Sequence, residues 1–218
     1  PLSIKAIADS FVIVFTNRAA LSYGLAGMFL FGALFGFISS SQQIYVDIYG
    51  LGVYFPVAFA AMAGLMSVSS FTNSRVVRRF GMRRLSHGAV LVFTGFSAVW
   101  LAFALTGMLP LWLFFSLLAI IMFSFGWAAS NMNSLSMEPL GAVAGTASAV
   151  FGFIQTVGGA IIGGYIGQLF NGTTIPAAAG YFSMGVLALA CILVAENGRL
   201  FGVGAQYAEA ESAGGAAH

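Results

Sequence analysis

Six long stretches without a charged residue constrain the fold of this chain more than any other feature. They run over residues 20–40, 53–72, 87–107, 111–135, 144–170 and 177–195, and none contains Asp, Glu, Lys or Arg. A helix of about 20 mostly apolar residues crosses a bilayer, and helices satisfy their own backbone groups in lipid. The alternating strands of about ten residues that are typical of a membrane β-barrel are missing. The sequence therefore predicts an all-α integral membrane protein with a six-helix transmembrane bundle over residues 20–197.

The composition excludes the main soluble classes. Hydrophobic residues make up 60% of the chain and charged residues 6%, with a mean hydropathy of +0.96, whereas soluble domains carry roughly 25% charged residues. A soluble enzyme, a nucleic-acid binder and a disulfide-rich secreted domain are thereby excluded. Cys191 is the single cysteine, so no internal disulfide can form. The lipid bilayer is the first partner that we expect.

The basic residues predict the orientation of the bundle. Five of the eight cations fall in one predicted loop between the second and third spans: Arg75, Arg78, Arg79, Arg83 and Arg84. Short loops rich in Lys and Arg stay on the cytoplasmic side, so this loop is predicted to be cytoplasmic. With six spans, every Lys and Arg then lies on that side, and both termini of this multi-pass protein are cytoplasmic.

The segments that flank the spans differ in character. In residues 1–19, apolar side chains recur at helical spacing beside Lys5 and Asp9, which indicates either an amphipathic helix on the cytoplasmic membrane surface or a plain linker. Residues 198–218 hold too few bulky apolar side chains to pack, so we expect a disordered cytoplasmic tail.

The residue types that most enzymes need are scarce. Lys5 is the only lysine, and His87 and His218 are the only histidines, so neither a phosphate-binding Walker lysine nor a histidine-based triad or metal site is expected. We predict that the chain is not an enzyme and uses no cofactor or metal.

Small residues mark the fifth span as a packing surface. Gly159, Gly163 and Gly167 repeat every four residues, and Gly152 precedes them in the same span. Small residues at this spacing let two helix backbones touch. Tight structural packing is the first interpretation, and a sliding contact between the halves of a transporter is the second.

A few polar and aromatic residues within or near the spans are candidates for ligand contact. Gln155 is the only amide in the middle of a span, and it needs either a hydrogen bond to another helix or a water-filled cavity. Trp127 shares a helical face with Asn131, which would suit an amphiphilic ligand or a plain core contact. Glu138 follows the fourth span, and we expect it to cap a helix or to pair with an arginine of the basic loop.

Two segments resemble a known family. Residues 138–168, EPLGAVAGTASAVFGFIQTVGGAIIGGYIGQ, are similar to the eleventh-helix region of the bicyclomycin/chloramphenicol resistance (Bcr/CflA) group of drug exporters in the major facilitator superfamily. Residues 73–85, NSRVVRRFGMRRL, are similar to its basic loop between helices eight and nine. The resemblance extends over nearly all six spans.

The resemblance implies that the spans are helices seven to twelve of that fold, arranged as two inverted three-helix repeats. Residues 1–19 would then link the two halves of the transporter. The first and fourth spans would line a central cavity, and the second and fifth would lie at the contact between halves. Carried over by helix, the cavity lining would include Phe35, Ser39 and Trp127, with Gln155 at its flank.

The resemblance also implies a function in the inner (cytoplasmic) membrane. It points to part of a secondary active multidrug efflux transporter, which exchanges amphiphilic drugs for protons by alternating access. An N-terminal six-helix half, on the same or a separate chain, would be the partner. No acidic residue lies in the middle of a span, and a proton relay needs an ionisable group at depth. Proton coupling is therefore expected from that other half. The alternative is a non-transporting structural half that pairs with a partner or with itself.

Overall fold

The computed structural model describes residues 4–201. Its α-helices are α1 (Ile4–Thr16), α2 (Arg18–Gln42), α3 (Phe55–Phe80), α4 (Met82–Thr106), α5 (Leu111–Met137), α6 (Ala144–Phe153), α7 (Gly159–Gln168) and α8 (Ile175–Ala195). Short 3₁₀ turns cover Gly52–Tyr54 and Glu138–Val143, and π-helical turns cover Gln43–Ile48 and Ile154–Gly158. No strand occurs in this part of the chain. The predicted tail lies outside the described residues from position 202 onward.

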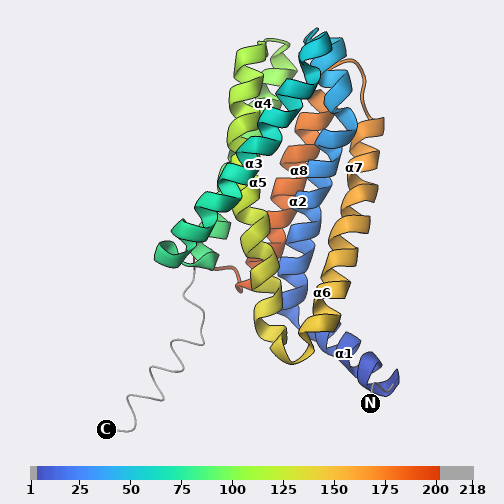
Figure 1. The fold of residues 1–218 in the computed structure, drawn as a ribbon, viewed down its shortest axis with the longest axis vertical. Helices are drawn as coiled ribbons and strands as arrows, with labels where there is room; N and C mark the ends of the chain where they lie inside the picture. The colour runs from blue at the N-terminus through green and yellow to red at the C-terminus, as the bar shows by residue number, and fades with distance from the viewer. Residues whose placement is uncertain (1–3, 202–218) are drawn as a thin grey trace.

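The bundle has the helices of a multi-pass membrane protein. Five continuous helical segments within residues 4–201 are long and apolar enough to cross a bilayer. One of them, Leu111–Gln168, runs for 58 residues and reverses direction at Glu138–Val143, where Leu140 leaves helical geometry (φ −114°, ψ 23°). Because α5 descends to this turn and α6 and α7 ascend from it (Figure 1), that segment makes two crossings. The predicted all-α membrane fold is confirmed.

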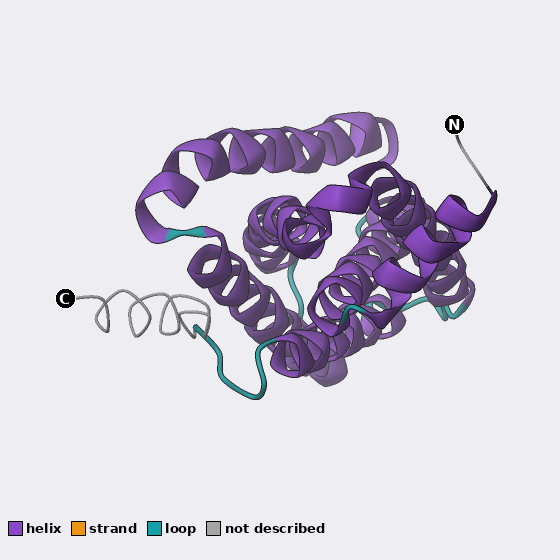
Figure 2. Ribbon diagram, turned by 90° about the horizontal axis from the view of Figure 1, so that it is seen from below, coloured by secondary structure: helices purple, strands orange, loops and turns teal. Residues whose placement is uncertain are grey.

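The packing follows an inverted repeat. α2 packs on α5, α7 and α8, while α5 packs on α2, α3 and α4, and α4 also packs on α8. Exchanging α2 with α5, α3 with α7 and α4 with α8 leaves this set of contacts unchanged. Since α2 and α5 run in opposite directions (Figure 1), the two three-helix units are related by inversion. Figure 2 views the bundle from the end that holds both termini of the described chain.

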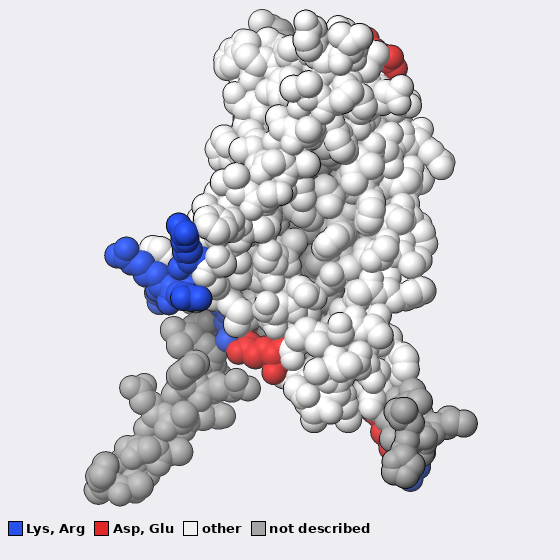
Figure 3. All heavy atoms as spheres, viewed as in Figure 1, with Lys and Arg blue, Asp and Glu red and all other residues white. Residues whose placement is uncertain are grey.

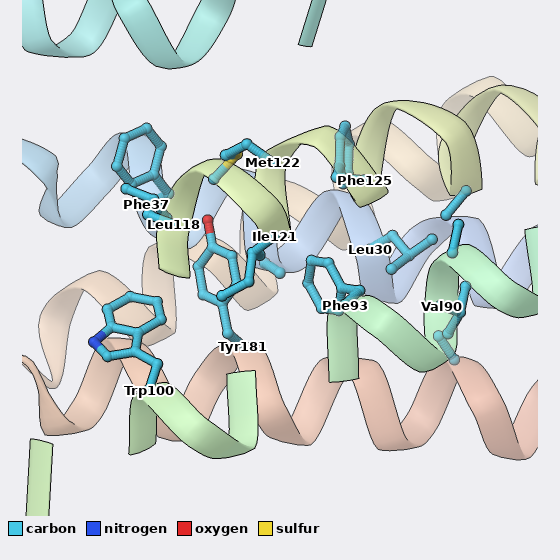
Figure 4. Packing of buried hydrophobic residues seen from close by; sticks show 14 of the residues in the cluster. Leu30, Phe37, Val90, Phe93, Trp100, Leu118, Ile121, Met122, Phe125 and Tyr181 are labelled. Atoms are coloured by element: carbon cyan, nitrogen blue, oxygen red, sulfur yellow. The ribbon is translucent and has the colours of Figure 1, made fainter. Parts of the chain in front are cut away.

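Aromatic residues build the core between α4, α5 and α8. The Tyr181 ring lies 5.6 Å from the Phe93 ring and 5.3 Å from the Trp100 ring, measured between centroids. Leu118 and Ile121 of α5 are fully buried beside them (Figure 4). This apolar core fixes α4, α5 and α8 relative to one another, and α2 and α3 pack against these helices.

The basic segment is helical, which corrects the predicted loop. Arg75, Arg78 and Arg79 lie in the last turns of α3, and Arg83 and Arg84 lie in the first turn of α4. Only Gly81 separates the two helices, with φ 79° and ψ 154°, a backbone geometry that glycine adopts readily. Arginine is a good helix former, and cations in the last turn of α3 complement its helix dipole.

The arginines gather at one end of the bundle (Figure 3), which we call the basic end. The exposed Asp47 lies at the other end, which we call the opposite end. α1 also lies at the basic end (Figure 1), where its Val14 is fully buried in a small cluster with Ala147 and Phe151 of α6. Phe11 of α1 is exposed.

Candidate functional site

The seam between α2 and α7 is the closest helix contact that the predicted glycines make. A Cβ atom added to Gly163 would lie 2.6 Å from the backbone nitrogen of Gly36, and one added to Gly167 would lie 2.7 Å from the Ser39 Cβ. One added to Gly159 would lie 3.0 Å from the Phe31 Cβ. All three glycines therefore face α2, and a larger residue at Gly163 or Gly167 would force neighbouring atoms to move.

Gly152 differs from the other glycines of the predicted packing surface. A Cβ atom added there would meet nothing within 4 Å. It lies in α6, before the π-helical turn Ile154–Gly158. Because that turn shifts the helical register, the spacing read from an ideal helix places Gly152 on the wrong face. The prediction that Gly152 packs against a helix of this bundle is wrong.

Phe35 and Ser39 lie one turn apart on the α2 side of this seam. The Phe35 side chain is half-buried, with its ring against Gly159 and its Cβ against Gly163. Ser39 is exposed beside Gly167. The two side chains predicted to line a cavity thus share the edge of one helix contact.

Gln155 is buried in the π-helical turn between α6 and α7. Its Nε2 would lie 2.7 Å from a Cβ atom added to Gly27 of α2, and it has no hydrogen-bond partner in the described chain. Leaving a buried donor unpaired costs roughly 1–3 kcal/mol, and π-turns inside α-helices often occur at functional positions. An interhelical hydrogen bond was one of the two expectations for Gln155. Its amide nitrogen lies at the seam and makes no such bond within residues 4–201.

Trp127 lies in a different part of the bundle, between α5 and α3. Its indole Nε1 donates to the Ser69 carbonyl (3.0 Å) and to the Thr72 Oγ1 (3.1 Å). One turn further along α5, the Asn131 Nδ2 donates to the Asn73 Oδ1 (2.8 Å). The polar cluster predicted on this face of α5 therefore holds α3.

The ring of Trp127 lines a cavity of about 490 Å³, which we call the lateral groove. Its lining comes from three helices: Leu65 of α3; Arg84, Leu85, Gly88, Ala89 and Val92 of α4; and Ala119, Ile120, Phe123, Ser124 and Trp127 of α5. Small residues such as Gly88 and Ala119 leave the space between the helices unfilled. The groove is apolar along its length and has Arg84 as its single cation.

Two salt bridges join the helices at the basic end. The Arg83 Nε lies 2.9 Å from the Glu196 Oε1, and the Arg83 Nη2 lies 3.0 Å from the Glu138 Oε2. The predicted pairing of Glu138 with an arginine of the basic segment is thereby confirmed. Glu196 is the more enclosed carboxylate, with 11% of its side chain exposed.

The same network continues inward through two residues that sequence reasoning missed. The Tyr23 hydroxyl donates to the Glu196 Oε1 (2.5 Å) and lies 3.1 Å from the His87 Nε2. The Phe201 backbone N–H donates to the His87 Nδ1 (3.1 Å). The chain of contacts ties α2, α4 and the segment after α8 together. The one signal in the sequence is a histidine placed at the start of an otherwise apolar span.

Within residues 4–201, no three His, Cys, Asp or Glu side chains converge to hold a metal ion. The seam, the lateral groove and the basic-end network offer contact surfaces and ion pairs. Taken with the inverted repeat, they define the class of this molecule: a multi-pass helical membrane protein built from two three-helix units.

Comparison with known proteins identifies two relatives by sequence. The chain is 30% identical over 198 residues to the bicyclomycin resistance protein homolog of Haemophilus influenzae, covering 89% of this chain and 47% of that protein. It is 26% identical over 190 residues to the uncharacterized major-facilitator-type transporter YdgK of Bacillus subtilis, covering 86% of this chain and 46% of that protein. No family model and no solved structure matches the chain.

The relatives confirm the resemblance to the bicyclomycin resistance group of the major facilitator superfamily. One relative carries the name of that group and the other carries the name of the superfamily. The chain spans about half the length of each relative. Neither is named as an enzyme, in agreement with the expectation from the sequence.

Proposed function

We propose that the chain is the C-terminal half, helices seven to twelve, of a secondary active multidrug efflux transporter that works by alternating access. The observation that carries this proposal is the inverted pair of three-helix units, combined with similarity to half of a bicyclomycin resistance protein homolog. Transporters of this superfamily bind substrate between two such halves and rock one against the other. The substrates that we propose are amphiphilic drugs.

A second six-helix half completes the pathway. The outward faces of α3 and α7 carry large exposed apolar side chains, among them Phe71 (59% exposed) and Ile161 (69% exposed). α3 and α7 occupy equivalent positions in the two inverted repeats. A partner half with the same internal pseudo-symmetry would therefore contact both of them. Without that partner, the same faces meet lipid.

The energy for transport comes from the partner half. Antiport of protons requires an ionisable group that is accessible in turn from each side of the membrane. The acidic side chains of residues 4–201 all lie at the ends of the bundle: Asp9, Asp47, Glu138 and Glu196. The groups that bind and release the coupled proton therefore belong to the N-terminal half, on the same or a separate chain.

The drug-facing surface of this half follows the edge of the seam between α2 and α7. Phe35 offers an aromatic face, and Ser39 offers a hydroxyl group to the same side. Gln155 adds an unpaired amide at the seam itself. An aromatic ring beside neutral polar groups suits an amphiphilic drug, because it provides apolar contact and hydrogen bonds without requiring a fixed charge.

In this proposal, the bundle lies in a bacterial inner membrane with its basic end on the cytoplasmic side. The first and last residues of the bundle lie on that side too. The support is the gathering of Arg75, Arg78, Arg79, Arg83 and Arg84 at one end, since short basic segments are retained on the cytoplasmic side. Labelling of single cysteines at Asp47 and Arg78 with a membrane-impermeant reagent in intact cells tests this orientation. We expect the cysteine at position 47 to react and the cysteine at position 78 to stay protected.

The function is tested by drug accumulation in an efflux-deficient bacterium. Three strains are compared: one expresses this chain alone, one expresses a six-helix partner alone, and one expresses both. The first partner to use is the part of the Haemophilus relative that this chain does not match. We expect extrusion of bicyclomycin and of a fluorescent amphiphilic drug only when both halves are present, and its loss on addition of a protonophore. Co-purification of the two halves without any extrusion would contradict transport and favour the non-transporting structural half.

A further inference from the structure

We propose that the lateral groove binds an anionic phospholipid of the leaflet at the basic end, with an acyl chain between α3, α4 and α5 and the phosphate group at Arg84. This site is separate from the drug-facing edge of the seam, and it depends only on the membrane placement of the bundle. The proposal combines the dimensions of the groove, its lining and the charges at its mouth.

The groove has the depth of a single leaflet. Its lining on α4 extends from Arg84 to Val92, a rise of about 12 Å at 1.5 Å per residue. One leaflet contributes about 15 Å of hydrocarbon to a bilayer. The groove thus begins at the headgroup level of the basic end and ends near the middle of the membrane.

The lining suits a hydrocarbon chain. Apart from Arg84 and Ser124, every residue that lines the groove is apolar or glycine, or is Trp127, whose N–H group already donates to α3. The Ser124 hydroxyl likewise donates to the Ile120 carbonyl (2.8 Å) within its own helix. Beyond Arg84, the side chains of the walls therefore present no free donor to a polar ligand, whereas a volume of about 490 Å³ accommodates methylene groups of a lipid tail.

The mouth of the groove carries positive charge without a matching carboxylate. Among residues 4–201, Arg83 makes the ion pairs, to Glu138 and Glu196. Arg84 points instead to the groove, and Arg75, Arg78 and Arg79 follow at the end of α3 with no carboxylate partner in the described chain. Arginine binds phosphate groups through several N–H donors at once, and basic pockets between membrane helices bind anionic lipid headgroups.

The arrangement distinguishes an anionic lipid from other amphiphiles. A cationic drug would be repelled by four unpaired guanidinium groups, and a zwitterionic lipid would gain less from them than an anionic one. Arg75 also lies 4.5 Å above the ring of Phe71, which is half-exposed at the same level of the bundle. An aromatic ring with a guanidinium group at the membrane surface is typical of the headgroup region.

Quenching of Trp127 fluorescence tests this site. The protein is placed in phosphatidylcholine vesicles with Trp112→Phe, which removes the lipid-exposed tryptophan at the opposite end; Trp100 remains, but it is 1% exposed in the core and so is shielded from lipid. The vesicles contain a small fraction of either phosphatidylglycerol or phosphatidylcholine with the same brominated acyl chains. We expect phosphatidylglycerol to quench at about a fivefold lower mole fraction, the effect of roughly one phosphate–arginine contact near the surface. Arg84→Gln should remove this preference, and salt should weaken it.

Two matched controls separate the groove from general attraction to the surface. Arg199→Gln removes one cation that does not line the groove, and it should keep the preference. Gly88→Leu fills the groove and should reduce quenching by both lipids, whereas Gly64→Leu, on the outward face of α3, should not. Equal quenching by the two brominated lipids would overturn the proposal, as would equal losses in Arg84→Gln and Arg199→Gln.

Discussion

The contacts of α7 with α2 and of α3 with α5 occupy equivalent positions in the two repeats, but they are built from different chemistry. α7 approaches α2 through Gly159, Gly163 and Gly167, so that backbone meets backbone. α3 is held to α5 by side-chain hydrogen bonds from Trp127 and Asn131. The first contact depends on the absence of side chains, and the second depends on their presence.

The difference has a structural consequence. In α7, four of the ten residues are buried (Gly159, Gly163, Ile166 and Gly167), whereas in α3 only three of the 26 are (Met62, Ser69 and Asn73). Glycine contacts fix the distance between helices along several turns, whereas a few hydrogen bonds hold one face and leave the rest of the helix free. The lateral groove lies on that free side, between α3, α4 and α5. The two repeats therefore share a topology and differ in how tightly the outer helix is held.

The largest effect is expected from Gly163→Leu, which places a branched side chain where the Gly36 backbone already lies. The α2 backbone cannot rotate away as a side chain can, so we expect a loss of about 3 kcal/mol or more in the free energy of unfolding. The yield of monodisperse protein after purification measures this loss. Gly164→Leu is the matched control, since a Cβ atom there meets nothing within 4 Å. A normal yield of Gly163→Leu would contradict close packing at the seam.

A milder pair of changes compares the two contacts directly. Gly163→Ala brings a methyl group within 2.6 Å of the α2 backbone, whereas Gly126→Ala brings one against the Ser69 side chain (2.5 Å from its hydroxyl oxygen and 2.8 Å from its Cβ) and no closer than 3.3 Å to a backbone atom. We expect a destabilisation of about 3 kcal/mol for the first and about 1 kcal/mol for the second, the two ends of the usual range for overpacking. Thermal unfolding in detergent measures both.

Gly164→Ala serves as the reference for this pair, because it gains helix propensity without a clash. If Gly126→Ala were as damaging as Gly163→Ala, the contact between α3 and α5 would be as rigid as the seam, and the comparison would fail.

A double-mutant cycle sharpens the polar side of the comparison. Asn73→Ala and Asn131→Ala each remove one partner of the amide pair between α3 and α5. Side-chain hydrogen bonds between membrane helices contribute about 0.6 kcal/mol on average, and we expect a coupling energy of about that size from unfolding in denaturing detergent. Zero coupling would mean that the two amides act independently and that the hydrogen bonds of Trp127 and Ser69 hold α3.

The smallest effect on stability is expected from Gln155→Leu. The Nε2 atom has no partner to lose, and its replacement removes the desolvation cost of an unpaired buried donor, so we expect the free energy of unfolding not to fall. Drug selectivity of the assembled transporter should change while its abundance stays constant, as measured by resistance profiles and immunoblots. An unchanged profile for every compound would indicate that the amide has no contact with the pathway.

The spans could be predicted because lipid leaves few alternatives to an apolar helix. Uncharged stretches predicted the positions of α2 to α8 to within a few residues, except that the arginines extend α3 and α4 almost to Gly81. A run of cations resembles a solvated loop in sequence, although arginine favours helices and its long side chain reaches water from a helix end. The spacing of Gly159, Gly163 and Gly167 predicted the seam, because glycines four residues apart lie on one helix face and let a second helix approach closely.

The rest depends on contacts between distant segments. The π-helical turn at Ile154–Gly158 has no sequence signature, yet it removes Gly152 from the packing face. The hydrogen-bond partners of Trp127, Ser69 and Thr72, lie more than 50 residues away in the chain. The Tyr23 hydroxyl meets His87 and Glu196, which lie 64 and 173 residues away in the chain.

Cysteine labelling at Ser39 tests the central claim that α2 forms one wall of a drug pathway completed by a second half. Ser39→Cys is made in a Cys191→Ala background, together with Ser183→Cys on the exposed face of α8 as a lipid-facing control. In the assembled transporter, we predict that a water-soluble thiol reagent modifies position 39 from the opposite end, that drug slows this reaction, and that position 183 stays unmodified. An unreactive position 39, or a reaction rate that drug leaves unchanged, would contradict the claim.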